Sequence, residues 1–158
     1  MAHSKDMSSP ELEPAFEVAV EVAVPLDLGV TAMGQRRIIH INGGSFEGPG
    51  LKGRVLPGGA DWQIVRADGT AELDARYTLQ TDQGALIYVV NRGLRHGPPE
   101  VLRRIAAGES VDPRSYYFRS AAFFETAAPD LQWLTKTIVI GSGERRRDQV
   151  LIRFWKVL

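Results

Sequence analysis

The chain contains no cysteine among its 158 residues, and this absence excludes several kinds of chemistry. Without thiols there is no disulfide bond, no thiolate metal site and no cysteine nucleophile, and nothing indicates an oxidising compartment. The sequence also lacks a run of about eighteen consecutive apolar residues, which a membrane-spanning helix would need. Residues 1–15 are polar and lack the apolar stretch of a signal peptide. We therefore expect a soluble, cytoplasmic protein without a membrane partner.

An excess of charge of either sign is missing as well. Nineteen Lys and Arg residues balance nineteen Asp and Glu residues, whereas nucleic-acid-binding proteins need a basic surplus or a basic face. The histidines are scattered, and His40 and His96 leave room for a two-histidine metal site at most. Residues 48–53 match the glycine pattern of dinucleotide sites, but residues 54–57 cannot begin the helix that would hold a pyrophosphate. The sequence thus predicts no nucleic-acid partner, no metal site and no cofactor.

What the sequence does contain is strand patterning. Residues 16–24 alternate between large apolar side chains and small or charged ones, which is typical of a β-strand. Residues 71–81 also alternate, and Asp68-Gly69 before them is a hairpin signal. One face of this second strand carries Leu73, Ala75, Tyr77 and Leu79, and the other carries Glu72, Asp74, Arg76, Thr78 and Gln80. Only residues 98–109 suggest a helix, with prolines at the start and Gly108 near the end.

Short strands separated by close turns predict an all-β fold. We expect a single antiparallel β-barrel of about 8–10 strands with one short helix. A barrel is favoured over a sandwich because the strands follow one another through tight turns and because closure removes exposed sheet edges. The predicted barrel domain covers residues 15–158, and residues 1–14 are predicted to form a mobile N-terminal arm.

Charged and aromatic side chains on the expected strands are the candidates for a site. In a small barrel alternate residues face the interior, where polar groups must be paired or hydrated. For Asp74 and Arg76 three interpretations remain open: an exposed strand face, an internal ion pair, or the lining of a pocket. Trp62 is either a core residue or a stacking platform at the barrel mouth, while Asp61 and Asp68 are first of all turn residues.

Several longer segments follow one another in a recognisable order: GQRR, GGSFEGPGLKG, VLPGGADWQIVRADGTAELDARYTL, GALIYVVNRG, YYFRSAAFFET and WLTK. From about Gly34 to the C-terminus the sequence resembles the domain of unknown function 3237 family, also called uncharacterised protein family 0311. The resemblance implies a barrel of lipocalin- or OmpA-like shape in a soluble setting, and it implies no established activity. The positions of interest that it implies are Asp61, Trp62, Arg66, Asp68, Asp74, Arg76, Tyr77, Arg119, Phe124 and Glu125.

Two functions fit these residues. In the first, the barrel binds or transforms a small anionic organic molecule, because arginine suits a carboxylate or enolate and a nearby carboxyl group can move a proton. In the second, the protein is not catalytic and is either a ligand carrier or an oligomerising barrel whose ion pairs only fix strand register. The predicted ligand-binding residues are Trp62, Arg66, Arg76, Tyr88, Arg119 and Phe124, and the predicted catalytic residues are Glu125 and Asp74. A homo-oligomer is left open.

Overall fold

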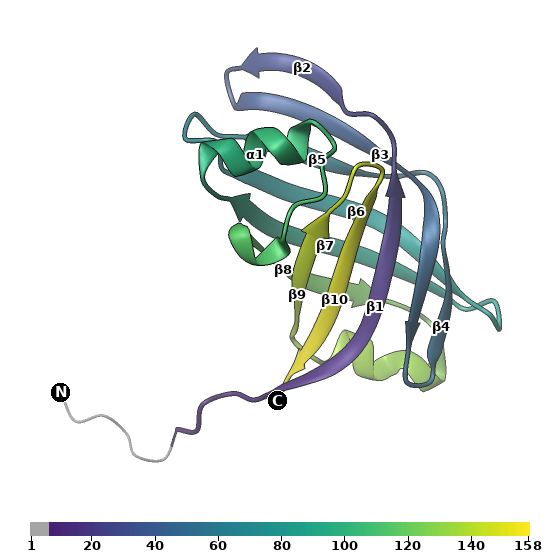
Figure 1. Ribbon diagram of the computed structural model, residues 1–158. Helices are drawn as coiled ribbons and strands as arrows, with labels where there is room; N and C mark the ends of the chain where they lie inside the picture. The colour runs from purple at the N-terminus through teal and green to yellow at the C-terminus, as the bar shows by residue number, and fades with distance from the viewer. Residues whose placement is uncertain (1–6) are drawn as a thin grey trace.

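A computed structural model describes residues 7–158 of the chain as an arrangement of antiparallel strands (Figure 1). The strands are β1 (Leu12–Val22), β2 (Leu26–Thr31), β3 (Gly34–Gly48), β4 (Leu51–Val55), β5 (Gly59–Val65), β6 (Ala71–Thr81), β7 (Leu86–His96), β8 (Tyr117–Glu125), β9 (Val139–Arg145) and β10 (Gln149–Val157). The helices are α1 (Pro99–Ala106) and two short 3₁₀ helices, η1 (Pro113–Ser115) and η2 (Pro129–Thr135). No helix among the described residues is long and apolar enough to cross a membrane.

The strands close into a barrel with eight positions around its circumference. Strand β1 pairs with β10 on one side and with β3 on the other, which joins the two ends of the sheet. Strand β3 pairs with β5 over its first half and with β4 near its end. Because β4 and β5 both also pair with β6, they share one position, and β6 to β10 complete the ring. Strand β2 pairs with β3 outside this ring.

This architecture confirms the prediction of an all-β, single antiparallel barrel. The α-helix begins at Pro99, close to the predicted start, whereas the two 3₁₀ helices were not predicted. The predicted N-terminal boundary needs a correction, because β1 begins at Leu12 and Leu12 to Pro14 already pair with the end of β10. A register shift between Pro14 and Phe16 marks the position where the alternation of the sequence pattern begins. Residues 1–6 of the expected arm lie outside the described residues.

One end of the barrel is filled by aromatic side chains. Phe16, Phe46, Phe124 and Phe154 are all buried, and the rings of Phe16 and Phe154 have centroids 5.0 Å apart. The rings of Phe124 and Phe154 meet edge to face at 5.8 Å. Burial of each such side chain stabilises the fold by about 1.5–3 kcal/mol, and aromatic pairing adds about 0.5–1.5 kcal/mol. This end therefore anchors the fold.

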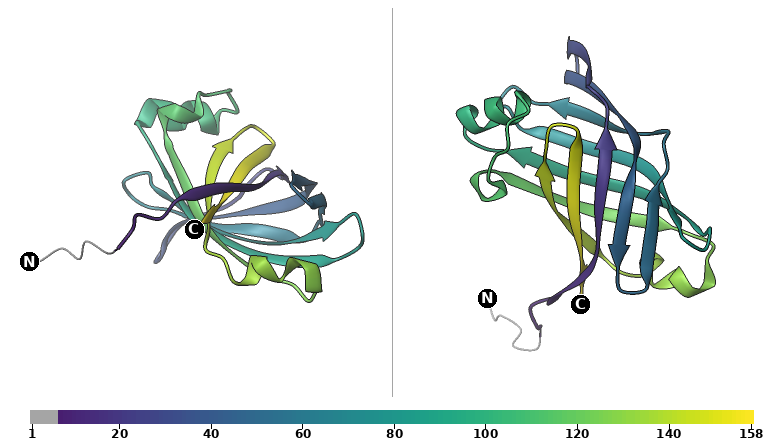
Figure 2. Two further views of the ribbon diagram at one scale, coloured as in Figure 1. Left: turned by 90° about the horizontal axis from the view of Figure 1, so that it is seen from below. Right: turned by 45° about the vertical axis from the view of Figure 1, so that its right-hand side comes forward.

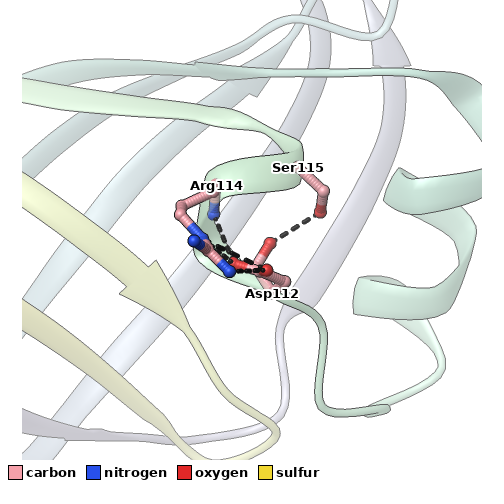
Figure 3. A network of polar contacts seen from close by, with 3 residues as sticks. All are labelled: Asp112, Arg114 and Ser115. Carbon is pink, nitrogen blue, oxygen red and sulfur yellow. Dashed lines mark hydrogen bonds and ion pairs between the residues drawn. The ribbon is translucent and has the colours of Figure 1, made fainter.

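The opposite end carries α1 and η1 in the connection between β7 and β8. Both views in Figure 2 place α1 and η2 at opposite ends of the strands. The buried side chain of Ile105 attaches α1 to the core. The η1 helix is held by Asp112, whose carboxylate accepts hydrogen bonds from the backbone N–H and guanidinium of Arg114, while the Ser115 hydroxyl donates to the Asp112 carbonyl (Figure 3). Immediately after η1, Tyr116 accepts a 2.9 Å hydrogen bond from the backbone N–H of Arg145.

Candidate functional site

Most of the predicted site residues lie on the outer wall of the barrel. In β6 the side chains of Leu73, Ala75 and Tyr77 face inward, so Asp74 and Arg76 face outward, where they form a 3.2 Å ion pair. This strand geometry supports the interpretation of the pair as an exposed face and excludes the internal ion pair. Burial of the ions would also have cost several kcal/mol each.

The other candidates follow the same alternation. In β8 the inner face carries Phe118, Ser120, Ala122 and Phe124, so Arg119 and Glu125 are exposed on the outside. Arg66 forms an exposed 3.3 Å ion pair with Glu72. The expectation that these arginines and carboxylates point into the barrel is therefore wrong. Phe124 does point inward, but it belongs to the aromatic end of the core.

Three predicted ligand-binding residues nevertheless come together on the outer surface. Trp62, Arg76 and Tyr88 line a hollow of about 380 Å³ beside the turn between β4 and β5. Trp62 has 44% of its surface exposed, so it is not a core residue. The side chains of Tyr88 and Asp74 both raise the pKa of Arg76, the effect of Asp74 being larger. This hollow brings one cation and two aromatic rings together, but all three are solvated.

The interior contains a second and more enclosed polar site, which we call the lumen cavity. It has a volume of about 60 Å³. Its polar lining residues are Asp61, Gln63, Tyr77, Asn91, Arg95, Ser120 and Arg145. Its apolar lining includes Val20, Val22, Ile39, Ile41, Leu73, Ala75, Phe118, Val150 and Ile152. The apolar walls and the few polar groups are the composition expected of a small-molecule pocket.

Strand register explains how the polar groups reach the lumen cavity. Ala75 on β6 pairs with Asp61 on β5 and with Asn91 on β7, so both polar residues flank it on the inner face. Gln63 follows Asp61 by two residues, and Arg95 follows Asn91 by four, which keeps each pair on one face of its strand. The lumen cavity thus receives side chains from adjacent strands of the closed ring.

Two glycines of β9 allow close packing of the β8 side chains that line the lumen cavity. A Cβ at Gly143 would lie 2.5 Å from the ring of Phe118, and a Cβ at Gly141 would lie 2.3 Å from the Ser120 hydroxyl oxygen. Both distances are far below ordinary van der Waals contact, so only glycine allows β9 to pass this close to β8 side chains. On β6 the small side chain of Ala75 lines the cavity between Asp61 and Asn91.

Asp61 is a buried carboxyl group with defined partners. Its Oδ1 accepts a 2.9 Å hydrogen bond from the backbone N–H of Asp74, and its Oδ2 accepts a 3.1 Å bond from the amide of Gln63. Both bonds and the charge of Arg95 favour the ionised form. Burial outweighs them and raises the pKa of Asp61 above its usual range. Asp61 is therefore the inward carboxyl group best suited to exchange a proton.

Two arginines bring positive charge to the same cavity. Burial and, to a smaller extent, the charges of Arg145 and Arg37 lower the pKa of Arg95 to about 10, whereas Asp61 opposes the shift. Burial also lowers the pKa of Arg145. The guanidinium carbon of Arg95 lies 5.7 Å from the centroid of the Phe118 ring. Within residues 7–158 neither Arg95 nor Arg145 takes part in an ion pair.

The lumen cavity also gathers polar atoms without partners. Across the described part of the chain, four buried side-chain atoms make no hydrogen bond: Gln63 Oε1, Tyr77 OH, Asn91 Oδ1 and Ser120 Oγ. All four residues line this cavity. A buried polar atom without a partner costs about 1–3 kcal/mol. Burial also raises the pKa of Tyr77, so its hydroxyl remains a proton donor.

Sequence reasoning identified part of this site. Asp61 and Tyr77 were among the positions implied by the family resemblance, although Asp61 was assigned to a turn. The residues it missed are Gln63, Asn91, Arg95, Ser120 and Arg145. For Asn91 and Arg95 a signal existed, because they share the strand face of Ile87 and Val89, which are fully buried.

Comparison with known proteins places the chain among uncharacterised relatives. A family model described as "Protein of unknown function (DUF3237)" matches residues 10–157. A UPF0311 protein of Rhodopseudomonas palustris is 43% identical over 148 residues, which cover 94% of this chain and 97% of the relative. The crystal structure of a conserved protein of unknown function from the same species has a TM-score of 0.91 at 42% identity, with 96% of this chain and 99% of that chain covered. A β-barrel-like protein from Acinetobacter baumannii has a TM-score of 0.85 at 44% identity, with 98% and 100% covered.

Proposed function

This chain belongs to the DUF3237 family, and we propose that its barrel binds a small organic anion in the lumen cavity, with Arg95 and Arg145 holding the negative charge. The supporting observation is that one cavity holds two largely buried guanidinium groups that form no ion pair with any residue from 7 to 158. Asp61 is the inward carboxyl group near them, and burial favours its neutral form. An anionic ligand would balance the excess of positive charge.

Charge energetics support this proposal. A buried ion loses several kcal/mol of hydration, which its surroundings must offset. An anion about 4 Å from a guanidinium recovers about 4 kcal/mol at an effective dielectric constant of 20. A carboxylate also matches the planar guanidinium group with two parallel hydrogen bonds. The exposed arginines of the outer wall gain much less from an anion, because water screens them.

The cavity volume limits the size of the ligand. A water molecule needs about 10–15 Å³ of such space, so a cavity of about 60 Å³ has room for about four to six waters. A short-chain organic acid occupies a comparable space. The apolar walls formed by residues such as Val20, Ile39 and Ile152 suit a hydrocarbon body behind the anionic group.

A thermal-shift screen with short-chain carboxylates tests the proposal. At a hundredfold excess over Kd, a ligand should raise the Tm by roughly 5–10 °C for a chain of this length. Arg95→Met should abolish the shift, and Arg145→Met reports on the same cavity if the first variant does not fold. The matched control is Arg54→Met, because Arg54 lies on the outer wall and donates to Gln80. Equal shifts in Arg54→Met and Arg95→Met, or no shift across the whole panel, would overturn the proposal.

A proton-transfer enzyme is the second candidate, and the raised pKa of Asp61 favours it. In this step a C–H bond next to a carbonyl group breaks, the proton moves to the ionised carboxylate of Asp61, which becomes neutral, and the electron pair moves into an enolate oxygen beside Arg95. Glu125 and Asp74, the carboxylates predicted from the sequence, face the outside and cannot reach that position.

Solvent exchange separates the enzyme from a carrier. In D₂O, NMR should detect deuterium entering the carbon next to the carbonyl group of a bound ligand, and Asp61→Asn should slow this entry by about a hundredfold or more. Exchange that persists in Asp61→Asn and disappears in Glu125→Gln would place the chemistry on the outer wall. A ligand that binds without any exchange would identify the barrel as a carrier.

A further inference from the structure

We propose that the ligand of the lumen cavity carries a hydroxyl group at the end away from its anionic group, so that the cavity selects such hydroxy acids over plain carboxylic acids. This inference rests on the proposed function and concerns the part of the ligand that the arginines do not contact. The inference is based on the four buried polar atoms that have no hydrogen-bond partner among the described residues, all of which belong to residues that line the cavity. Each of these residues is more than nine-tenths buried.

The four atoms fall into donors and acceptors. Tyr77 and Ser120 carry hydroxyl groups that can donate, and burial keeps the Tyr77 hydroxyl protonated by raising its pKa. Gln63 has a fixed orientation, because its amide N–H already donates to Asp61 Oδ2. Its Oε1 is therefore an acceptor that no donor meets among the described residues. Asn91 Oδ1 adds a second acceptor.

This combination of donors and acceptors distinguishes a hydroxyl group of the ligand from a carbonyl group. A ligand carbonyl accepts hydrogen bonds and could meet only Tyr77 and Ser120. A hydroxyl group both donates and accepts, so it can also serve an acceptor such as Gln63 Oε1. Apart from its carboxylate, a plain carboxylic acid carries neither a carbonyl nor a hydroxyl group, so all four buried atoms stay without a ligand partner. Sites with buried hydrogen-bonding groups reject analogues that lack the matching group, because the buried polar atoms are left unpaired.

Strand positions place these groups apart from the arginines along the barrel. On β7, Arg95 lies four residues after Asn91 on the same inward face, which is about 13 Å along the strand. On β6, Tyr77 lies further still toward the aromatic end, opposite Val89. A ligand whose anionic group meets Arg95 therefore extends its other end toward the neutral hydrogen-bonding groups.

A matched set of three acids tests the inference: 4-hydroxypentanoate, 4-oxopentanoate and pentanoate, with Kd values measured by calorimetry. We expect the hydroxy acid to bind about tenfold more tightly than pentanoate, the effect of one net hydrogen bond, and the oxo acid to lie between them. In Tyr77→Phe and Ser120→Ala this ratio should fall by about threefold or more, while the Kd of pentanoate changes by less than about twofold. Tyr117→Phe is the matched control, because Tyr117 is an exposed tyrosine of the outer face that stacks on His96.

The outcomes separate this inference from the proposed function. Equal Kd values for the three acids, with binding still lost in Arg95→Met, would overturn the hydroxyl selectivity and leave the anion site intact. Tighter binding of the oxo acid than of the hydroxy acid would show that the acceptors are not used, and would also overturn it. Failure of all three acids to bind would count against both. An equal loss of selectivity in Tyr117→Phe would contradict the assignment to the lumen cavity.

Discussion

Asp61 is a carboxyl group that the fold buries, although its ionised form is more stable in water. Its carboxylate accepts hydrogen bonds from the backbone of Asp74 and the side chain of Gln63, yet burial still raises its pKa. The neutral form is thus favoured in the folded chain relative to the unfolded chain. Groups with such shifted pKa values occur often at functional sites, where a protein loses some stability in return for activity.

The raised pKa of Asp61 predicts how stability depends on pH. Since the folded-state pKa lies above the unfolded value near 3.8, the contribution of Asp61 to stability is fully present below that value. It is lost as the pH rises through the folded-state pKa. Asp61→Asn, which keeps a neutral side chain of similar shape, should therefore be more stable than the wild type at pH 7. Chemical denaturation at several pH values should show this difference shrinking as the pH falls through the folded-state pKa toward about 4 and levelling off below it, and a difference that grows toward low pH would contradict this expectation.

Among the strands, β5 shows why the sequence predicted the wrong face to point into the barrel. Its apolar residues Trp62 and Ile64 alternate with Asp61 and Gln63, and a rule that places apolar residues inside selects Trp62. The structure has the opposite arrangement, with Asp61 and Gln63 lining the cavity. The same rule succeeded for β6, where Tyr77 and its apolar neighbours face inward as one group. A functional cavity is the place where such local rules are expected to fail.

The strand pattern therefore predicted the fold but only part of the candidate site. Alternation and turn residues depend on neighbouring positions, so the strands and the closed barrel could be predicted. Which polar face points inward depends on the partners across the barrel, and these come from distant parts of the chain. Arg95 and Arg145 meet at one cavity although fifty residues separate them in sequence. No short motif links them.

The pair of strands β8 and β9 supports a prediction about the shape of the cavity. Gly143→Ala would place a Cβ 2.5 Å from the ring of Phe118, so the ring must move. We expect a loss of about 1–3 kcal/mol in the free energy of unfolding, the usual cost of overpacking a core. Because Phe118 also lines the lumen cavity, ligand binding should weaken in the same variant. A Tm unchanged within error would show that β9 can shift away, and would contradict the tight contact.

At the scale of the whole molecule, the barrel has two different ends. The phenylalanine cluster with Phe16 and Phe154 fills one end and supplies stability. The other half keeps a small cavity lined by Asp61, Arg95 and Arg145. This division lets one end carry the packing energy while the other tolerates buried charge. We propose that the charged half of the interior, and not the outer wall, holds the binding site.

Calorimetric titration of one carboxylate ligand into two arginine variants distinguishes the lumen cavity from the outer wall. Arg95→Met removes a cation of the lumen cavity, and Arg119→Met removes an exposed cation of the outer wall that the sequence also favoured. We expect Arg95→Met to weaken binding by at least about a hundredfold, as is usual for a largely desolvated charge pair, and Arg119→Met to leave the Kd unchanged within about twofold. Loss of binding in Arg119→Met, with the affinity of Arg95→Met preserved, would contradict the proposal.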